Sequence, residues 1–333
     1  MSDAHYWMVA AESRALHAGA VIGRRICNVA LVLYRDPDGT PIAAPDRCLH
    51  RCGKLSAGTA RRGVLKCPYH GWAYGAGGRV VAIPSEDAAG PFRLPVYETC
   101  ERDGYVYVRL DRGVESAPFA MPHYRARGFG RVRLVNVFEN TVTNCAENFV
   151  DVPHTVSVHP GIFRQARAEK INATVAVERG EVRVEYFGER TNLGWFAFAL
   201  NPRGLPVRHI DRFIAPNITH VRYEIGRSVF LITSQSVPET ATRTRVHTEL
   251  AWRLGALTPF AAPFVRIQGQ RVIDQDKRVL ADQMDVIADR PGPFIDTSAD
   301  LIHAHIHALR AAVEAGEDPA ALPSQRSNIE FYV

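Results

Sequence analysis

The sequence contains CLHR at residues 48–51 and CPYHGW at residues 67–72, two short segments that each combine a cysteine with a histidine. Both segments lie between turn-forming residues, so we expect them to form loops. Their side chains offer two thiolates and two imidazoles, from Cys48, His50, Cys67 and His70. Such a set either binds one tetrahedral zinc ion or divides between the two irons of an iron–sulfur cluster, with both cysteines on one iron and both histidines on the other.

A second segment with metal-binding potential is ENFVDVPHTVSVHP at residues 147–160. Asp151 and His154 are three residues apart, a spacing that places two side chains on one face of a helix. His159 follows five residues after His154, beyond Pro153, which disturbs a helix. Two such imidazoles can bind one metal ion, and a carboxylate would complete the two-histidine-one-carboxylate triad of non-haem Fe(II) sites. This triad leaves positions open for O₂ and substrate.

The third ligand is expected in a helix over residues 271–288, which contains Asp274, Asp276 and Asp282. Its inward face is defined by side chains that recur at intervals of three and four, namely Ile273, Asp276, Leu280, Met284 and Ile287. A carboxylate among aliphatic side chains is costly unless it is paired or bound to metal. We therefore predict Asp276 as the third ligand, because Asp274 and Asp282 lie on the polar face.

The chain divides into an all-β part and a mixed part. Residues 20–110 contain short strand-like runs separated by turn signals, and a mixed segment at 111–122 follows, so we place domains at 1–115 and 116–333. Strands are expected at 131–138, 173–178, 182–187, 195–200, 219–225, 228–237 and 243–254. Helices are expected around 140–152 and at 271–288 and 300–314, the last capped by Thr297 or Ser298. Strands followed by helices predict an α+β domain, an antiparallel sheet covered by helices on one side.

The composition is that of an ordinary globular protein, with 46% hydrophobic and 23% charged residues and a formal net charge of +5. The basic residues are scattered, so we expect no nucleic-acid partner. Apolar runs such as 195–200 are too short to span a membrane, and the N-terminus has no signal-peptide pattern, so we expect a cytoplasmic protein. In this setting the six cysteines are expected to be metal ligands or free thiols and not disulfides.

The segments at residues 48–51 and 67–72 resemble the cluster-binding loops of the Rieske family, in which a glycine equivalent to Gly71 lets backbone amides approach the cluster sulfurs. Respiratory-type members carry an additional disulfide cysteine in each loop. Tyr69 stands at that position in the second loop, so the chain is similar to the oxygenase type. The residues from Asn148 to His159 match the N-x-x-D-x-x-H-x-x-x-x-H pattern of Rieske non-haem iron oxygenase α subunits. The Gln-Asp-Lys sequence around Asp276 is similar to the short monooxygenase and demethylase branch.

This resemblance implies a fold, two cofactors and an assembly. The fold is an all-β Rieske domain followed by a helix-grip-like catalytic domain. A [2Fe–2S] cluster would be held by the two Cys–His loops, and a mononuclear Fe(II) by His154, His159 and Asp276. Asp151 would connect a cluster histidine of one subunit to an iron histidine of its neighbour in a homotrimer, with Asn148 close to this path.

The activity that the resemblance implies is monooxygenation, either hydroxylation or oxidative demethylation, of a small organic or natural-product substrate with O₂. The sequence has no G-x-G-x-x-G nucleotide fingerprint, so electrons would come from a separate reductase or ferredoxin. Two other interpretations stay open, a Rieske electron-transfer protein and a metal-stabilised ligand-binding module. His303, His305 and His307 are interpreted as surface or interface histidines, and Trp195, Phe196 and Phe198 mainly as packing residues.

Overall fold

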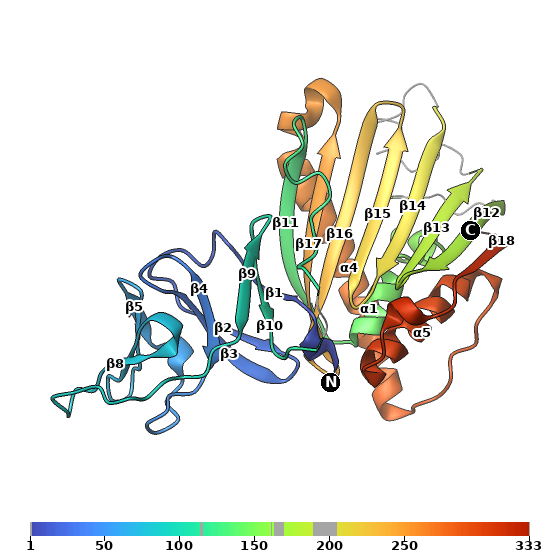
Figure 1. The fold of residues 1–333 in the computed structure, drawn as a ribbon. Coiled ribbons are helices and arrows are strands. Elements are labelled where there is room, and N and C mark those ends of the chain that lie inside the picture. Colours follow the sequence, from blue (N-terminus) through green and yellow to red (C-terminus); the bar gives the residue numbers. More distant parts are fainter. Residues whose placement is uncertain (1, 114–115, 161, 163–169, 189–204, 333) are drawn as a thin grey trace. The chain divides into compact units, whose positions relative to one another are not determined.

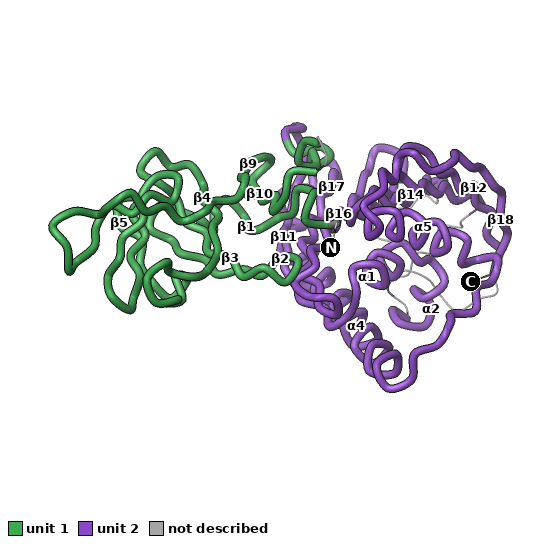
Figure 2. Tube along the Cα trace, turned by 60° about the horizontal axis from the view of Figure 1, so that its bottom comes forward, with its two compact units in different colours: residues 1–124 green, residues 125–333 purple. Residues whose placement is uncertain are grey.

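A computed structural model of the chain describes residues 2–113, 116–160, 162, 170–188 and 205–332. It contains two compact units, Met1–Tyr124 and Arg125–Val333 (Figure 2). The division lies after Tyr124, later than the division at residue 115 that the sequence analysis expects. Within the described ranges, the helices are all too short or too polar to span a bilayer.

The first unit consists of short antiparallel strands in three sheets (Figure 1). The first sheet contains β1 (Met8–Glu12), β10 (Tyr105–Arg109) and β9 (Glu98–Arg102). The second sheet contains β2 (Ile22–Ile26), β3 (Val29–Arg35) and β4 (Pro41–Pro45). The third sheet contains β5 (Thr59–Arg61), β6 (Val64–Lys66), β7 (Ala73–Tyr74) and β8 (Val80–Ala82). The expected all-β domain is confirmed, and the two Cys–His loops precede β5 and β7.

In the described residues, the second unit is built on one antiparallel sheet of eight strands, in the order β11-β17-β16-β15-β14-β13-β12-β18. The strand bounds are β11 (Gly130–Phe138), β12 (Lys170–Glu178), β13 (Glu181–Phe187), β14 (Val207–Ile214), β15 (Ile218–Ile225), β16 (Ser228–Thr240), β17 (Arg243–Arg253) and β18 (Gln325–Tyr332). Because successive side chains of a strand point to opposite faces, each strand presents one set of residues to the helices and one set away from them.

Helices cover one face of this sheet (Figure 1). They are α1 (Val142–Asn148), α2 (His154–Val158), α4 (Ala262–Asp289) and α5 (Leu301–Ala315). One core cluster joins α5 to β12 and β13, through Ile306 and Leu309 against Val182 and Val184. A second core cluster joins α4 to β11 and β17. The predicted helix-covered antiparallel sheet is confirmed, and Thr297 caps the turn that leads into α5.

Three features of the second unit differ from the sequence-based expectation or lie beyond it. Strands β14 and β18 were not predicted, and the predicted strand at 195–200 lies outside the described residues. Helix α4 begins at Ala262 and not at residue 271, because Pro263 is tolerated in a first helical turn. Gly269 also belongs to this helix, and a Cβ atom there would lie 2.5 Å from Leu250 Cδ1. The glycine therefore permits close packing of α4 on the sheet.

Candidate metal centres and the cavity beside them

The first unit brings together the four predicted cluster ligands. Cys48 and Cys67 are neighbours in its core, and each has 2% of its surface exposed. His50 and His70 are solvent-exposed, and their ring centroids lie 4.5 Å apart. The thiols therefore lie inside the unit and the imidazoles at its surface, an arrangement that separates the two ligand types.

The two loops repeat one backbone arrangement. In each loop the cysteine N–H donates to the carbonyl five residues later, that of Gly53 at 2.9 Å and that of Trp72 at 2.8 Å. The N–H four residues later donates back to the cysteine carbonyl, from Cys52 at 3.1 Å and from Gly71 at 3.2 Å. Both of these donor residues have positive φ, +55° and +74° respectively. The loops thus hold the two cysteines in equivalent backbone geometry.

Tyr74 supports the first loop, a role that the sequence analysis missed. Its hydroxyl oxygen accepts from Leu49 N–H at 3.1 Å and lies 3.0 Å from Cys48 Sγ, so its own proton can be directed at the sulfur. Burial, together with the neighbouring Cys48, raises the pKa of Tyr74 above its usual range, so the hydroxyl stays protonated and can donate. Hydrogen bonds to sulfur ligands are one of the features that set the reduction potential of an iron–sulfur cluster.

The geometry of the four Cys and His donors argues against one shared zinc ion. Among the described residues, three metal-binding donor atoms lie within 4.8 Å of one another at His154, His159 and Asp276, but not at the two Cys–His loops. A tetrahedral zinc site needs all of its ligand atoms about 2.0–2.3 Å from one ion. Burial raises the pKa of Cys67, and the adjacent thiol of Cys48 adds to this effect, so metal binding has to displace a tightly held proton from the sulfur.

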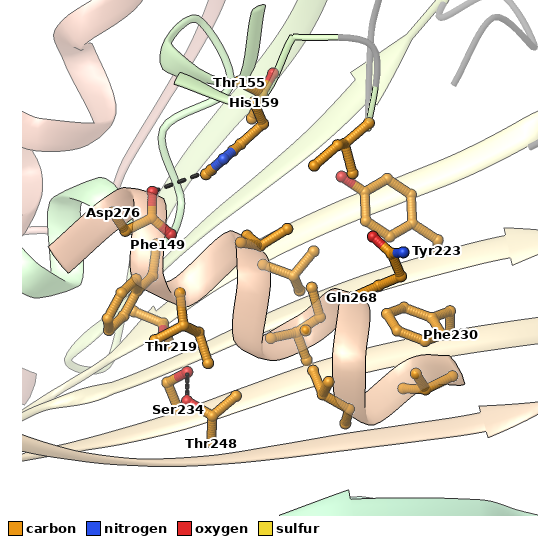
Figure 3. A pocket seen from close by; sticks show the side chains of 18 of the residues that line it. Phe149, Thr155, His159, Thr219, Tyr223, Phe230, Ser234, Thr248, Gln268 and Asp276 are labelled. Carbon is orange, nitrogen blue, oxygen red and sulfur yellow. Dashed lines mark hydrogen bonds and ion pairs between the residues drawn. The ribbon is translucent and has the colours of Figure 1, made fainter. Parts of the chain in front are cut away.

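His154, His159 and Asp276 converge in the second unit. Oδ1 of Asp276 lies 3.0 Å from Nε2 of His159 and 3.6 Å from Nε2 of His154, and Figure 3 shows the shorter contact. This oxygen is buried and has no partner in hydrogen-bond geometry. Asp276 is buried on the inward face of α4, as the helical periodicity predicts, whereas Asp274 is half-buried and Asp282 is exposed.

The other ring nitrogen of each histidine faces a polar partner. Nδ1 of His159 lies 2.9 Å from Oε1 of Gln275, and Nδ1 of His154 lies 3.3 Å from Oδ2 of Asp151. An amide oxygen only accepts, so His159 donates from Nδ1, and its Nε2 is left on the side of Asp276, where a metal ion can bind. Outer partners of this kind orient metal-binding imidazoles, so these three residues fit a metal ion with carboxylate and Nε2 ligands. This role of Gln275 was not predicted from the sequence.

The charges of this group stabilise one another. Burial alone would lower the pKa of His154, but Asp151 and Asp276 outweigh burial and raise it to about 9. Burial alone would raise the pKa of Asp276, but His154 and His159 outweigh burial and hold it below its usual value. The imidazole of His154 and the carboxylate of Asp276 therefore stabilise each other's charged forms.

The expectation that Asp151 and His154 share one helix face is wrong. Helix α1 ends at Asn148 and α2 begins at His154, so Asp151 lies in the turn between the two helices. Pro153 stands at the N-cap of α2, where a missing N–H costs nothing. The turn still brings the Asp151 carboxylate to His154. Asn148 has a buried Oδ1 without a partner in hydrogen-bond geometry and borders the cavity described below.

A cavity of about 380 Å³ lies beside this group, and all three candidate ligands line it. One wall is the helix-facing side of the sheet, where Val221, Ile232 and Leu250 are aligned across three strands. The adjacent row contains hydroxyl groups, and Ser234 Oγ lies 3.1 Å from Thr248 Oγ1 (Figure 3). The cavity can therefore hold a largely apolar molecule against the metal-binding group.

The remaining residues that the sequence analysis singled out lie away from these sites or outside the described part. His303 lies 3.3 Å from Asp300, and the half-exposed His307 lies 2.6 Å from Glu147. Neither histidine belongs to a cluster of metal-binding donors within the part that the structure describes. Trp195, Phe196 and Phe198 lie outside the described residues.

Comparison with known families matches both units. Residues 6–98 match the Rieske [2Fe-2S] domain, and residues 139–315 match the vanillate O-demethylase oxygenase C-terminal domain. The second match alone covers more than half of the chain.

Curated relatives carry related names. The oxygenase component of dicamba O-demethylase from Stenotrophomonas maltophilia is 31% identical over 182 residues, which are 53% of this chain and 53% of that protein. Methylxanthine N1-demethylase NdmA from Pseudomonas putida is 30% identical over 195 residues, 55% of each chain. The vanillate O-demethylase oxygenase subunit of a Pseudomonas strain is 29% identical over 235 residues, 66% of this chain and 64% of that protein. The matched regions thus span between about half and two thirds of these relatives.

Solved structures share the fold. Dicamba monooxygenase bound to dicamba superposes with a TM-score of 0.80 at 22% identity, over 93% of this chain and 97% of that chain. NdmA from Pseudomonas putida superposes with a TM-score of 0.78 at 21% identity, over 98% of this chain and 97% of that chain. At this level of identity the likeness concerns the fold of the chain.

Proposed function

Because the chain belongs to the Rieske oxygenases with a vanillate O-demethylase-type C-terminal domain, we propose that it is an oxygenase component. It uses O₂ and externally supplied electrons to hydroxylate or oxidatively demethylate a small organic molecule. The observation that carries this proposal is the convergence of His154, His159 and Asp276 on the wall of a largely apolar cavity. An electron-transfer protein has no need of this cavity.

The chain's residues divide into two ligand sets. Cys48, His50, Cys67 and His70 would hold the [2Fe–2S] cluster, and His154, His159 and Asp276 would hold the mononuclear iron. When bound, the iron supplies O₂ activation with electrons that pass through the cluster. Gln275 contacts Nδ1 of His159, and the carboxylate of Asp151 lies 3.3 Å from Nδ1 of His154, so the Nε2 atoms of both imidazoles are left toward the metal.

The cavity holds the substrate with one carbon atom next to the metal-binding group and limits the access of water. Its aligned aliphatic side chains contact the apolar part of the substrate, but such contacts do not fix the orientation of the substrate. Insertion of one oxygen atom into a C–H bond gives a stable alcohol when the carbon is bound to carbon. When the carbon is a methyl group on O or N, the hydroxylated product breaks down to formaldehyde and the demethylated compound.

The partners in this proposal are a small-molecule substrate and a separate reductase or ferredoxin, with the chain acting as a homotrimer. The separate electron donor is supported by the relatives, two of which are named as an oxygenase component or an oxygenase subunit. A cytoplasmic location, expected from the sequence, stays a prediction.

The test of this proposal is O₂ uptake by the reduced protein with a surrogate reductase and a panel of methoxyarenes and N-methyl heterocycles. Product mass separates the two outcomes, since hydroxylation adds one oxygen atom and demethylation removes one CH₂ group. Substrate-dependent uptake with either mass change supports the proposal. Uptake that no compound stimulates, by a protein that carries both metal centres, would contradict it.

Substitution of a cluster ligand, Cys67→Ser, is expected to abolish the visible absorption of the cluster and its reduced-state EPR signal. The second unit has its own core and should stay folded, so its circular dichroism and its mononuclear iron should persist. Cys100→Ser, in the same unit but outside both loops, is the matched control and should keep the spectrum. Unchanged absorption in the Cys67 variant would show that the ligand assignment is wrong.

Substitution of the residue behind His159, Gln275→Leu, is expected to weaken binding of the mononuclear iron by about 10–100-fold. The reason is that Nδ1 of His159 loses its acceptor and the imidazole is no longer held with Nε2 toward Asp276. Gln275→Glu retains an acceptor and should restore metal binding. Titration of the iron-free protein with Fe(II) measures the effect. Equal affinity of the leucine and glutamate variants would exclude this positioning role.

A further inference from the structure

A buried histidine–aspartate pair lies on β14 and is not used in the mechanism above. His209 and Asp211 are 1% and 2% exposed, and Nε2 of His209 lies 2.8 Å from Oδ1 of Asp211. Both point to the same side of the sheet, because they are two residues apart on one strand, and the pairing of Asp211 with Val221 shows that this is the helix-facing side. Asp211 also lines the cavity that holds the three candidate iron ligands.

The surroundings of this pair fix its geometry. The His209 ring is stacked between Tyr186 and Tyr223, with centroid distances of 4.5 and 4.1 Å and interplanar angles of 24° and 20°. The cross-strand neighbours of Asp211 on the same face are Val184 and Val221, both buried. Figure 3 shows Tyr223 on the cavity wall, away from the His159–Asp276 contact. Stacking on both faces therefore holds the ring in the orientation in which its Nε2 contacts Oδ1 of Asp211.

The carboxylate of Asp211 is left with acceptor capacity. His209 is its hydrogen-bond partner, and no second partner is present in the described ranges of the chain. A carboxylate has about four acceptor sites, and burying it among valines is costly unless they are used. Arg271 also borders the cavity, but its side chain is exposed, so solvent screens its charge.

We propose that Asp211 is a specificity-determining residue that accepts a hydrogen bond from an N–H or O–H group of the substrate. The same carboxylate disfavours a substrate that carries its own carboxylate at this end of the cavity, because two like charges would be buried together. His209 is a positioning residue that holds Asp211 in place. This proposal rests on the proposed function in one respect, namely that the bound molecule is a substrate. The hydrogen bond to Asp211 is a property of binding and can be measured without turnover.

The test measures binding without turnover. Guaiacol and its meta and para isomers, their methyl ethers and the corresponding methoxybenzoates are titrated calorimetrically into the anaerobic holoenzyme. The phenols should bind about tenfold or more tightly than the ethers, which lack the donor, and the benzoates should bind most weakly. In Asp211→Asn the ratio of phenol to benzoate affinity should fall by about tenfold, because the repulsion is removed and the amide can donate to a carboxylate.

A matched control is Asp282→Asn, an exposed position on α4, which should keep the wild-type ratio. General disturbance of the cavity would weaken all three compound classes together and leave the ratio unchanged, which would overturn the assignment. Benzoates that bind as tightly as phenols, or phenols that do not bind, would overturn it as well. Selective phenol binding without O₂ uptake would leave the assignment of Asp211 intact and contradict the proposed function alone.

Discussion

Replacement of Asp276 by alanine is expected to remove the mononuclear iron and to abolish turnover while leaving the cluster intact. Iron content should fall by about one atom per chain, because the triad requires the carboxylate as well as both imidazoles. The remaining His154 and His159 would lose the buried anion that now lies 3.6 and 3.0 Å from their Nε2 atoms. Iron analysis together with the visible spectrum of the cluster measures both parts of this result.

The control for this experiment is Asp282→Ala, an exposed carboxylate on the same helix. It should retain both iron centres and full activity. Circular dichroism of the two variants shows whether α4 is still folded. An Asp276→Ala variant that keeps its third iron atom and its activity would move the carboxylate ligand to another residue.

Replacement of Asp151 by asparagine is expected to keep both metal centres and a reducible cluster but to lower turnover by about 100-fold or more. Asp151 faces Nδ1 of His154 at 3.3 Å, so it contacts a candidate ligand without being one. The amide is nearly isosteric, but it cannot accept charge-assisted hydrogen bonds from two imidazole N–H groups. Single-turnover kinetics of the pre-reduced protein should show slow oxidation of the cluster while iron content stays at the wild-type level.

Mixed oligomers test whether the electron path from the cluster through Asp151 to the mononuclear iron crosses between chains. Cys67→Ser and Asp276→Ala chains, each inactive alone, are unfolded or dissociated together and reassembled. If electrons pass from the cluster of one chain to the iron of the next, part of the activity returns in the mixture, as a closed ring such as a trimer allows. An active monomer, or the absence of rescue in oligomers proven to be mixed, would contradict the inter-subunit path.

Much of the architecture could be predicted because its signals are local. Helical periodicity alone placed Asp276 on the buried face of α4 and separated it from Asp274 and Asp282. Strand β14 was missed because His209 and Asp211 occupy its helix-facing positions while Ile210 lies on the opposite face. Its polar and apolar side chains therefore do not alternate in the way that marks a half-buried strand.

The supporting residues of the site could not be predicted for a different reason. Gln275 belongs to the Gln-Asp-Lys sequence around Asp276, but its role, like that of Tyr74, arises from a contact with a residue on another element, His159 and Cys48 respectively. The relative placement of two elements depends on tertiary packing, which local patterns do not contain. Asp151 shows the intermediate case, because its spacing to His154 indicated a contact although the turn that makes it was not foreseen.

Iron analysis of the purified protein combined with Mössbauer spectroscopy tests the assignment of both metal centres most directly. We expect about three irons per chain, two in a [2Fe–2S] cluster with unequal sites, sulfur-ligated and nitrogen-ligated, and one in a separate high-spin ferrous site. Removal of the ferrous component by Asp276→Ala, with the cluster signal unchanged, would complete the assignment. A protein with two irons and no ferrous site, or with zinc in place of iron, would contradict it.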